Sequence, residues 1–368
     1  MPPPSCTARS SRWTAGSPPS AASDGRRAMA ETLPYKAVLV DYDEDLYSPR
    51  GFEADLLAQA GIAWAVGQHR TPEAVVEAAR DADVVLIQSV RPLLNREVIG
   101  SLPKCRGLIR LGIGYDSVDV RAATEYGIPV CNVPTYCVRD VAEHALALLM
   151  ASVRHLACQD RWVRAGRWDR TGASPTLRMQ GRTLGFVAFG RIARTLADLV
   201  QGFGMTLLAA DPYVDAETMA RHGVQKVDLD ELLRRSDFIS VHAPLTEKTR
   251  HLLSHREFAL MKDGVVLVNT SRGPVVDEAA LVEALRSGKV RGAGLDVMEQ
   301  EPLPPDSPLR TLDNVTMTPH VGAYSDESVE DLYRIGCRIV VDLVQGIWPE
   351  EVVNPEVEGR TRFPFRRR

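Results

Sequence analysis

Short runs of apolar and β-branched residues alternate with amphipathic segments along most of the 368 residues, and this alternation constrains the fold more than any other feature. In the first third, the runs occur at residues 37–40, 84–87, 107–111 and 129–133. Helical segments are expected at 52–60 and 118–126, each followed by a glycine where a helix should end (Gly61, Gly127). Strand and helix alternation is typical of βαβ units, so the sequence predicts an α/β fold with a parallel sheet.

A second alternating series follows a long amphipathic helix that is expected from Asp140 to about Val153. Its six apolar runs occur at residues 184–188, 206–210, 238–242, 265–269, 293–297 and 315–318. They predict a second parallel sheet. The last helix, expected from near Ser325 to about Gly346, has no strand of its own and should return to the first sheet. We therefore expect a discontinuous first domain, residues 34–133 and 322–356, and a second domain of residues 134–321.

The two ends of the chain differ in composition from the part between them. Residues 1–28 contain eleven Pro or Ser, four Arg and a single acidic residue, which predicts a disordered tail that extends to about residue 33. A transit peptide is an alternative, although the five prolines disfavour an amphipathic helix, and a translation start at Met29 is another. Residues 357–368 are rich in arginine and are expected to form a solvated basic tail.

Charge, hydropathy and cysteine usage exclude several classes of function. The formal net charge of −4 arises from 44 basic and 48 acidic residues that are interspersed, so nucleic acid is not an expected partner. No apolar stretch approaches the roughly 18–20 residues of a membrane span, and the best candidate is residues 145–151. The six cysteines form no Cys-x-x-Cys pair, which favours reduced thiols in the cytoplasm and gives no support for a metal site.

A glycine-containing turn lies between the run at 184–188 and a segment of helical periodicity. Gly190 occupies the middle position of a dinucleotide-binding fingerprint, whereas Ala188 and Ala193 replace its first and third glycines. Alanine is accepted at the third position, but Ala188 adds a methyl group at the tight turn. Asp211 ends the next run 21 residues after Gly190, where a carboxylate binds the adenine ribose hydroxyls and repels a 2′-phosphate. The pattern therefore favours NAD over NADP.

Three polar residues then follow the later apolar runs in chain order: Arg272, Glu301 and His320. Taken singly, they are better explained as a surface cation, a loop acid and a histidine with satisfied hydrogen bonds. Taken together after a dinucleotide motif, they suit the oxidation of a secondary alcohol. That reaction needs a base for the hydroxyl proton, a cation for an α-carboxylate, and an acid that holds the base protonated during reduction.

From about Lys36 to Pro355, the chain resembles the D-isomer-specific 2-hydroxyacid dehydrogenases, and most of all the branch that includes the C-terminal binding protein corepressors. The resemblance is carried by motifs that begin at Arg110, Pro129, Val141, Phe189, Val241, Asn269, Gly294, Glu301 and Thr318. It implies a Rossmann-like NAD-binding domain and a flavodoxin-like substrate domain, with the active site in the cleft between them. It also implies a homodimer built around a helical arm at about residues 140–168.

The resemblance also implies roles for individual residues. Arg272 matches the arginine that binds the substrate carboxylate and carbonyl, Glu301 the acid that favours imidazolium, and His320 the proton donor. Residues 111–114 (Leu111, Gly112, Ile113 and Gly114) match a loop whose backbone holds the carboxylate, and Asp296 matches a contact to the nicotinamide carboxamide. The implied cofactor-binding residues are Ile113, Val141, Phe189, Gly190, Arg191, Ile192, Asp211, Pro212, His242, Ala243, Pro244, Thr249, Thr270, Ser271, Arg272, Asp296 and His320.

One departure from that branch concerns the substrate. After the catalytic histidine, the corepressors typically place a tryptophan where this chain has Ala323, so their aromatic wall and their substrate are not carried over. Two hypotheses follow. The first is an NAD-dependent enzyme that interconverts a small 2-keto acid and its D-2-hydroxy acid by hydride transfer. The second is an NAD(H)-sensing scaffold whose closure promotes dimerisation and partner binding. The intact Arg272, Glu301 and His320 favour the enzyme.

Overall fold

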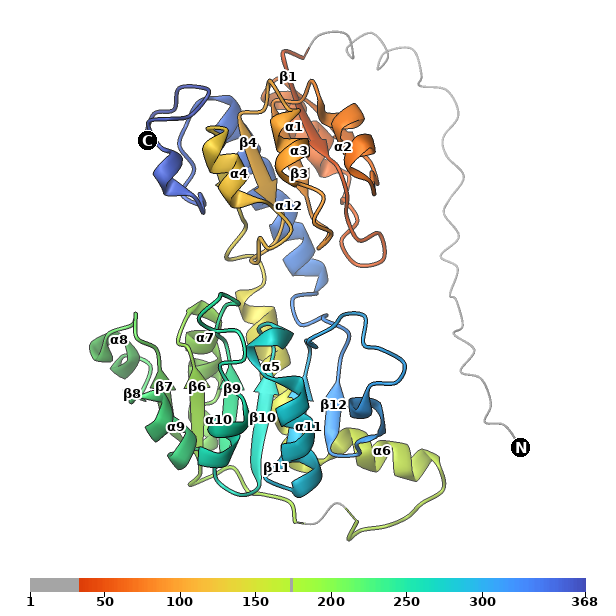
Figure 1. Cartoon of the computed structure of the whole chain (residues 1–368), viewed down its shortest axis with the longest axis vertical. Coiled ribbons are helices and arrows are strands. Elements are labelled where there is room, and N and C mark those ends of the chain that lie inside the picture. The colour runs from red at the N-terminus through yellow and green to blue at the C-terminus, as the bar shows by residue number, and fades with distance from the viewer. Residues whose placement is uncertain (1–32, 173–174) are drawn as a thin grey trace.

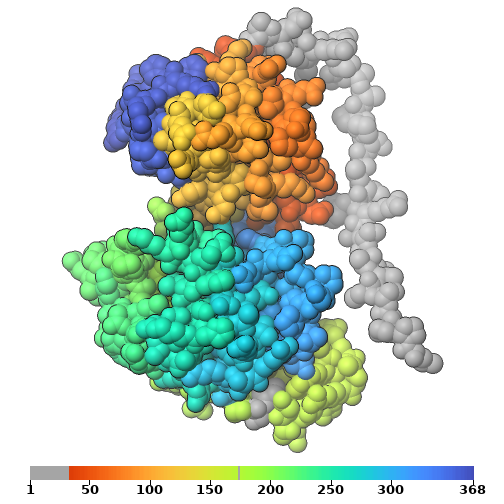
Figure 2. Space-filling model, in the orientation of Figure 1, coloured from red at the N-terminus to blue at the C-terminus, as the bar shows by residue number. Residues whose placement is uncertain are grey.

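The computed structural model describes residues 33–172 and 175–368. The expectations for residues 1–28, with Cys6, and for Met29 lie outside these residues. The chain forms two parallel sheets of five and seven strands, each flanked by helices, which confirms the predicted α/β fold. The sheets belong to two lobes that meet at a narrower waist (Figures 1 and 2).

The first lobe contains the five-stranded sheet, whose strand order is β2-β1-β3-β4-β5. Its elements are β1 (Tyr35–Leu39), α1 (Phe52–Gln59), β2 (Ile62–Val66), α2 (Pro72–Ala79), β3 (Val84–Ile87), α3 (Arg96–Gly100), β4 (Gly107–Arg110), α4 (Val120–Glu125) and β5 (Val130–Cys131). The last long helix, α12 (Asp326–Val344), returns to this lobe and packs against α1, β3 and β4. Its residues Tyr333 and Val340 share one hydrophobic core with Leu39 and Leu86 of the sheet.

The second lobe contains the seven-stranded sheet, in the order β12-β11-β10-β9-β6-β7-β8. Its strands are β6 (Thr183–Val187), β7 (Thr206–Ala210), β8 (Val224–Lys226), β9 (Phe238–Val241), β10 (Val265–Asn269), β11 (Val290–Leu295) and β12 (Val315–Met317). Its α-helices are α5 (Val138–Arg154), α6 (Leu156–Arg164), α7 (Arg191–Leu199), α8 (Ala216–Ala220), α9 (Leu229–Arg235), α10 (His255–Leu260) and α11 (Glu278–Ser287). Short 3-10 turns are η1 (Gln201–Phe203), η2 (Gly273–Val275), η3 (Pro308–Thr311) and, beside the first lobe, η4 (Pro355–Val357).

Helix α5 enters the second lobe from the waist and packs against β10 and β11 (Figure 1). It ends where His155 adopts a left-handed backbone conformation with φ of 53°, and α6 then projects from the lobe. Among the described residues, no single helix is long and apolar enough to cross a membrane. Only α5 and α6 taken together reach that length and composition, across a bend of 62°.

Two edge strands, β2 and β8, are absent from the sequence prediction. β2 is half exposed, and β8 has only three residues, of which Gln225 and Lys226 are exposed. β8 (VQK) lacks the continuous apolar run by which the buried strands were recognised. β2 (IAWAV) does have such a run, but the sequence prediction did not assign it to a strand.

Residues 357–368, expected to be a solvated basic tail, are mostly exposed but also make specific contacts with the first lobe. Arg362 donates to the carbonyl oxygens of Tyr126 and Leu102, at 2.7 and 2.8 Å. The guanidinium of Arg106 lies 4.5 Å from the ring centre of Phe363, and the ring of Phe365 packs edge-on against Trp348. The aromatic residues between the arginines therefore dock the segment on the first lobe, where Figure 1 shows the C-terminus.

Candidate active site

Apart from Val141, which lies in α5, the residues singled out in the sequence follow the carboxyl ends of strands in both sheets. In chain order, residues 111–114 follow β4, 189–192 follow β6, Asp211 and Pro212 follow β7, residues 242–244 and Thr249 follow β9, residues 270–272 follow β10, Asp296 and Glu301 follow β11, and His320 follows β12. Because the strands are parallel, these ends share one edge of each sheet. The edges meet where Arg272 Nε lies 3.5 Å from Asp116 Oδ2 of the first lobe.

His320 and Glu301 form a hydrogen-bonded pair. Nδ1 of His320 lies 2.8 Å from Oε2 of Glu301, and the other carboxylate oxygen accepts from the Met298 amide at 3.0 Å. Burial raises the pKa of Glu301, but the hydrogen bond and charge of His320 outweigh it and hold the pKa below its usual value. The two side chains remain 36% and 37% exposed, so a ligand can reach the pair. Nε2 is the ring nitrogen left to exchange a proton.

Asp296 organises the segment that carries His320. Its Oδ1 accepts from the amide of Val321 at 2.9 Å, and its Oδ2 accepts from the amide of Gly322 at 2.8 Å. Burial raises the pKa of Asp296, but hydrogen bonds from two side chains and these two amides outweigh it and lower the pKa to about 2. The backbone of His320 is left-handed, with φ of 56°, a conformation that must be held by its surroundings.

The turn after β10 presents Arg272. Asn269 fixes this turn, because its side-chain oxygen accepts from the Ser271 amide at 3.0 Å and its nitrogen donates to the Arg272 carbonyl at 3.1 Å. Two glycines make room around it. A Cβ on Gly114 would lie 1.7 Å from Arg272 Nη2, and one on Gly273 would lie 1.8 Å from the Met298 carbonyl oxygen. Gly273 thus lets the loop of Glu301 approach the turn of Arg272.

Arg110 is a cation near this site that the sequence reasoning did not select. It is buried, with 9% of its surface exposed, and its Nη1 donates to the Leu111 carbonyl. Within the described residues, its Nε has no hydrogen-bond partner. Burial lowers the pKa of Arg110, and the nearby charge of Arg272 acts in the same direction. Arg110 begins one of the motifs that carry the family resemblance. Only the fold shows that its guanidinium packs against Gly112.

The turn between β6 and α7 has the features of a dinucleotide site. Ala188 is left-handed, with φ of 69°, which is the conformation a fingerprint glycine supplies without strain. A Cβ on Gly190 would meet nothing within 4 Å, and α7 begins there with no side-chain cap, so its first amides face open space. Asp211 Oδ2 accepts from the Phe189 amide at 2.9 Å. Thr270 Oγ1 is buried and, among described residues, unpartnered. These residues fit a bound dinucleotide.

Several residues selected for contact with the cofactor, and Leu111, which was selected for contact with the substrate, have buried side chains. Val141 of α5 is buried in the core of the first lobe and Phe189 in that of the second, so both side chains are engaged in core packing. Leu111 is fully buried against α12, where it lies under Gly336. Burial lowers the pKa of His242 to about 4, and its Nε2 lies 2.8 Å from Ser240 Oγ. His242 is therefore neutral near pH 7.

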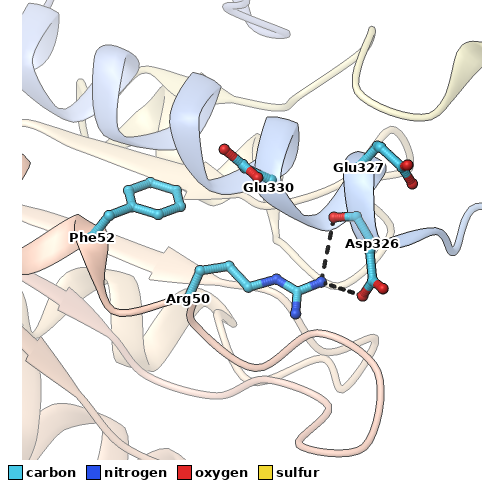
Figure 3. A pocket seen from close by; sticks show the side chains of 5 residues that line it. All are labelled: Arg50, Phe52, Asp326, Glu327 and Glu330. Carbon is cyan, nitrogen blue, oxygen red and sulfur yellow. Dashed lines mark hydrogen bonds and ion pairs between the residues drawn. The ribbon is translucent and has the colours of Figure 1, made fainter.

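A separate open pocket lies at the start of α12 (Figure 3). It is lined by Arg50, Phe52, Asp326, Glu327 and Glu330, and Arg50 Nη2 lies 3.0 Å from Asp326 Oδ1. Its carboxylates would repel an anionic substrate. Among the described residues, no group of three or more His, Cys, Asp or Glu side chains is placed to hold a metal ion, and the five described cysteines are free and buried.

Comparison with known proteins identifies the family of this fold and site. A family model described as D-isomer specific 2-hydroxyacid dehydrogenase, NAD binding domain, matches residues 146–322. The chain is 38% identical to the glyoxylate reductase of Korarchaeum cryptofilum over 310 residues, which cover 83% of this chain and 91% of that protein. The chain belongs to the D-isomer specific 2-hydroxyacid dehydrogenases, a family of NAD-dependent enzymes that act on the CH–OH group of their donors.

Two further proteins are also similar to this chain. The D-3-phosphoglycerate dehydrogenase of Methanocaldococcus jannaschii is 40% identical over 285 residues, which cover 77% of this chain and 54% of that protein. The chain thus spans about half the length of that relative. The structure of D-lactate dehydrogenase from Aquifex aeolicus complexed with NAD and lactic acid is similar with a TM-score of 0.73 and 29% identity, over 84% of this chain and 96% of that one.

Proposed function

We propose that the protein interconverts a small 2-keto acid and its D-2-hydroxy acid with NAD(H), and that His320 is the acid and base. The observation that carries this proposal is the 2.8 Å contact between His320 Nδ1 and Glu301 Oε2, in a pair that remains accessible. The carboxylate favours imidazolium, so Nε2 holds a proton to donate to the substrate carbonyl during reduction. In oxidation, the neutral imidazole accepts the hydroxyl proton.

Arg272 is proposed to bind the substrate carboxylate, because its planar guanidinium lies at the meeting point of the two lobes. The buried Arg110 adds a second positive charge close to Arg272, so this part of the site favours an anionic ligand. The turn at Gly190, with Asp211 and Thr270, would hold NAD(H). NAD(H), when bound, supplies or accepts the hydride at its nicotinamide ring.

The experiment is a panel of 2-keto acids (glyoxylate, pyruvate, hydroxypyruvate and longer acids) with NADH, followed by nicotinamide absorbance. We expect turnover with at least one acid, and a loss of about 10²–10⁴ in kcat for His320→Ala with little change in NADH affinity. If NADH binds but no acid is turned over, the proposal that the protein is an enzyme is overturned, and the hypothesis of an NAD(H)-sensing scaffold is favoured. Wild-type turnover by His320→Ala would remove His320 from the reaction.

We also propose a homodimer that forms through α6 and the segment after it. Three large apolar side chains are exposed there: Leu156 at 55%, Val163 at 52% and Trp168 at 82%. A run of this kind marks an interaction surface, and a second copy of the same arm supplies a matching apolar face. Sedimentation velocity should give twice the mass of 40.5 kDa, and Val163→Asp should shift the protein toward monomer. A wild-type monomer would exclude the dimer.

A further inference from the structure

Helix α5 lies over β11 in a register that brings one of its side chains to Asp296. Gly292, Gly294 and Asp296 alternate along one face of β11 and the residue after it. A Cβ on Gly292 would lie 3.5 Å from the Ser152 carbonyl oxygen, and one on Gly294 would lie 2.8 Å from Leu148 Cβ. The helix and strand run in opposite directions, so the next step along each brings His144 over Asp296. The small glycines let the helix approach this closely.

The contacts of His144 define its hydrogen-bonding state. Its Nε2 lies 2.9 Å from Thr318 Oγ1 and 3.4 Å from Asp296 Oδ1. Thr318 donates its single hydroxyl proton to Asp296 Oδ1 at 2.6 Å, so the hydroxyl oxygen can only accept from His144. Nε2 of His144 therefore carries a proton and donates. Gly322 completes the fit, since a Cβ there would lie 3.1 Å from His144 Cδ2 and 2.8 Å from Asp296 Oδ2.

The carboxylate that His144 and Thr318 hold is the same one that clamps the segment around His320. Asp296 accepts from the amides of Val321 and Gly322, and its own carbonyl oxygen accepts from the His320 amide at 2.8 Å. One turn earlier on α5, Asp140 Oδ1 accepts from Ser325 Oγ at 2.5 Å. The first two turns of α5 therefore form hydrogen bonds with both ends of the segment that leads from β12 to α12.

We propose that His144 is a positioning residue: through Thr318 and Asp296 it fixes the left-handed backbone of His320 and so keeps the imidazole on Glu301. This inference rests on the proposed function. His144 contacts neither His320 nor Glu301. It acts by restricting the Asp296 carboxylate to one orientation. Without it, Asp296 loses one of the two side chains that hold it, and the segment that carries His320 gains freedom to swing away from Glu301.

The test compares His144→Leu, which removes the donor, with His144→Gln, whose side-chain amide nitrogen can donate in place of Nε2. We expect His144→Leu to lower kcat by up to about 10²-fold, the cost of a small misplacement of a reacting group, with a much smaller change in KM and NADH affinity. The high-pH limb of the rate profile should move to lower pH, because the imidazolium of His320 loses its carboxylate. His144→Gln should recover most of the rate and the original limb.

A second readout is the NMR titration of the His320 imidazole in protein labelled with ¹⁵N-histidine, assigned by the signal that His320→Gln removes. We expect the titration to move to lower pH in His144→Leu and back in His144→Gln. In the double variant with Glu301→Gln, the shift should be no larger than in Glu301→Gln alone, because both changes break one contact. This readout needs no substrate, so failure of the wild type to reduce any keto acid would overturn the proposed function and leave the positioning role tested.

Val153→Ala is the matched control, because Val153 is a buried residue in the last turn of the same helix, away from Asp296. It should lower thermal stability through a small cavity while kcat and the His320 titration stay at wild-type values. If His144→Leu behaves like Val153→Ala, losing stability with normal kinetics and titration, the residue is merely structural and the inference is wrong. It is equally wrong if His144→Gln is as impaired as His144→Leu.

Discussion

At the scale of single residues, the pairing of Glu301 with His320 decides how the site responds to pH. His320 Nδ1 lies 2.8 Å from Glu301 Oε2, and the hydrogen bond and charge of His320 lower the pKa of Glu301 despite its burial. Glu301→Gln keeps a similar shape but removes the charge. We therefore expect the high-pH limb for keto-acid reduction to move to lower pH, measured as kcat/KM across the pH range. A move to higher pH would contradict the pairing.

A second prediction at this scale concerns Arg272 as the residue that binds the substrate carboxylate. Lysine carries the same charge but lacks the planar fork that binds a carboxylate through two parallel hydrogen bonds. Arg272→Lys should raise the keto-acid KM and lower kcat while NADH affinity stays within a few fold. Arg182→Lys is a suitable control, because Arg182 also pairs with a carboxylate, Asp237 at 3.0 Å, but precedes β6 at the opposite edge of the sheet. Kinetics that change equally in both variants would argue against a carboxylate anchor.

At the scale of elements, the turn between β6 and α7 is destabilised by alanine at a position where the dinucleotide fingerprint has glycine. Ala188 is left-handed, where a Cβ costs roughly 1–2 kcal/mol, while glycine would add chain entropy to the unfolded state. Ala188→Gly should therefore raise the free energy of unfolding by up to about 1 kcal/mol. NADH should bind equally or more tightly, by fluorescence titration. A large loss of affinity would mean that the turn is adapted to alanine.

The elements also show how far sequence reasoning reaches. β3 and β10 have the predicted bounds, 84–87 and 265–269, because fully buried parallel strands are continuous apolar runs with sharp ends. The dyad of Glu301 and His320 was predictable, because both residues follow adjacent strands of a parallel sheet. Arg110 and His144 were not, since their roles depend on which helix or loop covers them, and no spacing in the sequence encodes that.

At the scale of the whole molecule, residues 361–368 are a structural part of the first lobe. Their removal would break the two hydrogen bonds from Arg362 and the contacts of Phe363 and Phe365 with Arg106 and Trp348. We expect a loss of about 1–3 kcal/mol in the free energy of unfolding, because these partly exposed contacts contribute on the order of 1 kcal/mol each or less.

Urea unfolding of the truncated and full chains would measure this loss. Arg367→Ala is the control, because it removes only the exposed ion pair with Glu358, at 2.6 Å, and should change stability by less than about 0.5 kcal/mol. A truncated chain with the stability of the full chain would show that the docking has no energetic weight.

The return of α12 to the first lobe has a consequence for the order in which the protein assembles during synthesis. One face of the five-stranded sheet, with Leu39 and Leu86, is covered by Val340 and other residues of α12, which leave the ribosome after residues 183–317. The seven-stranded sheet, between residues 183 and 317, is complete before then. We therefore expect the first lobe to finish folding after the second, although it is translated first. About two hundred residues of synthesis separate its sheet from α12, and the apolar face of the sheet stays uncovered during that time.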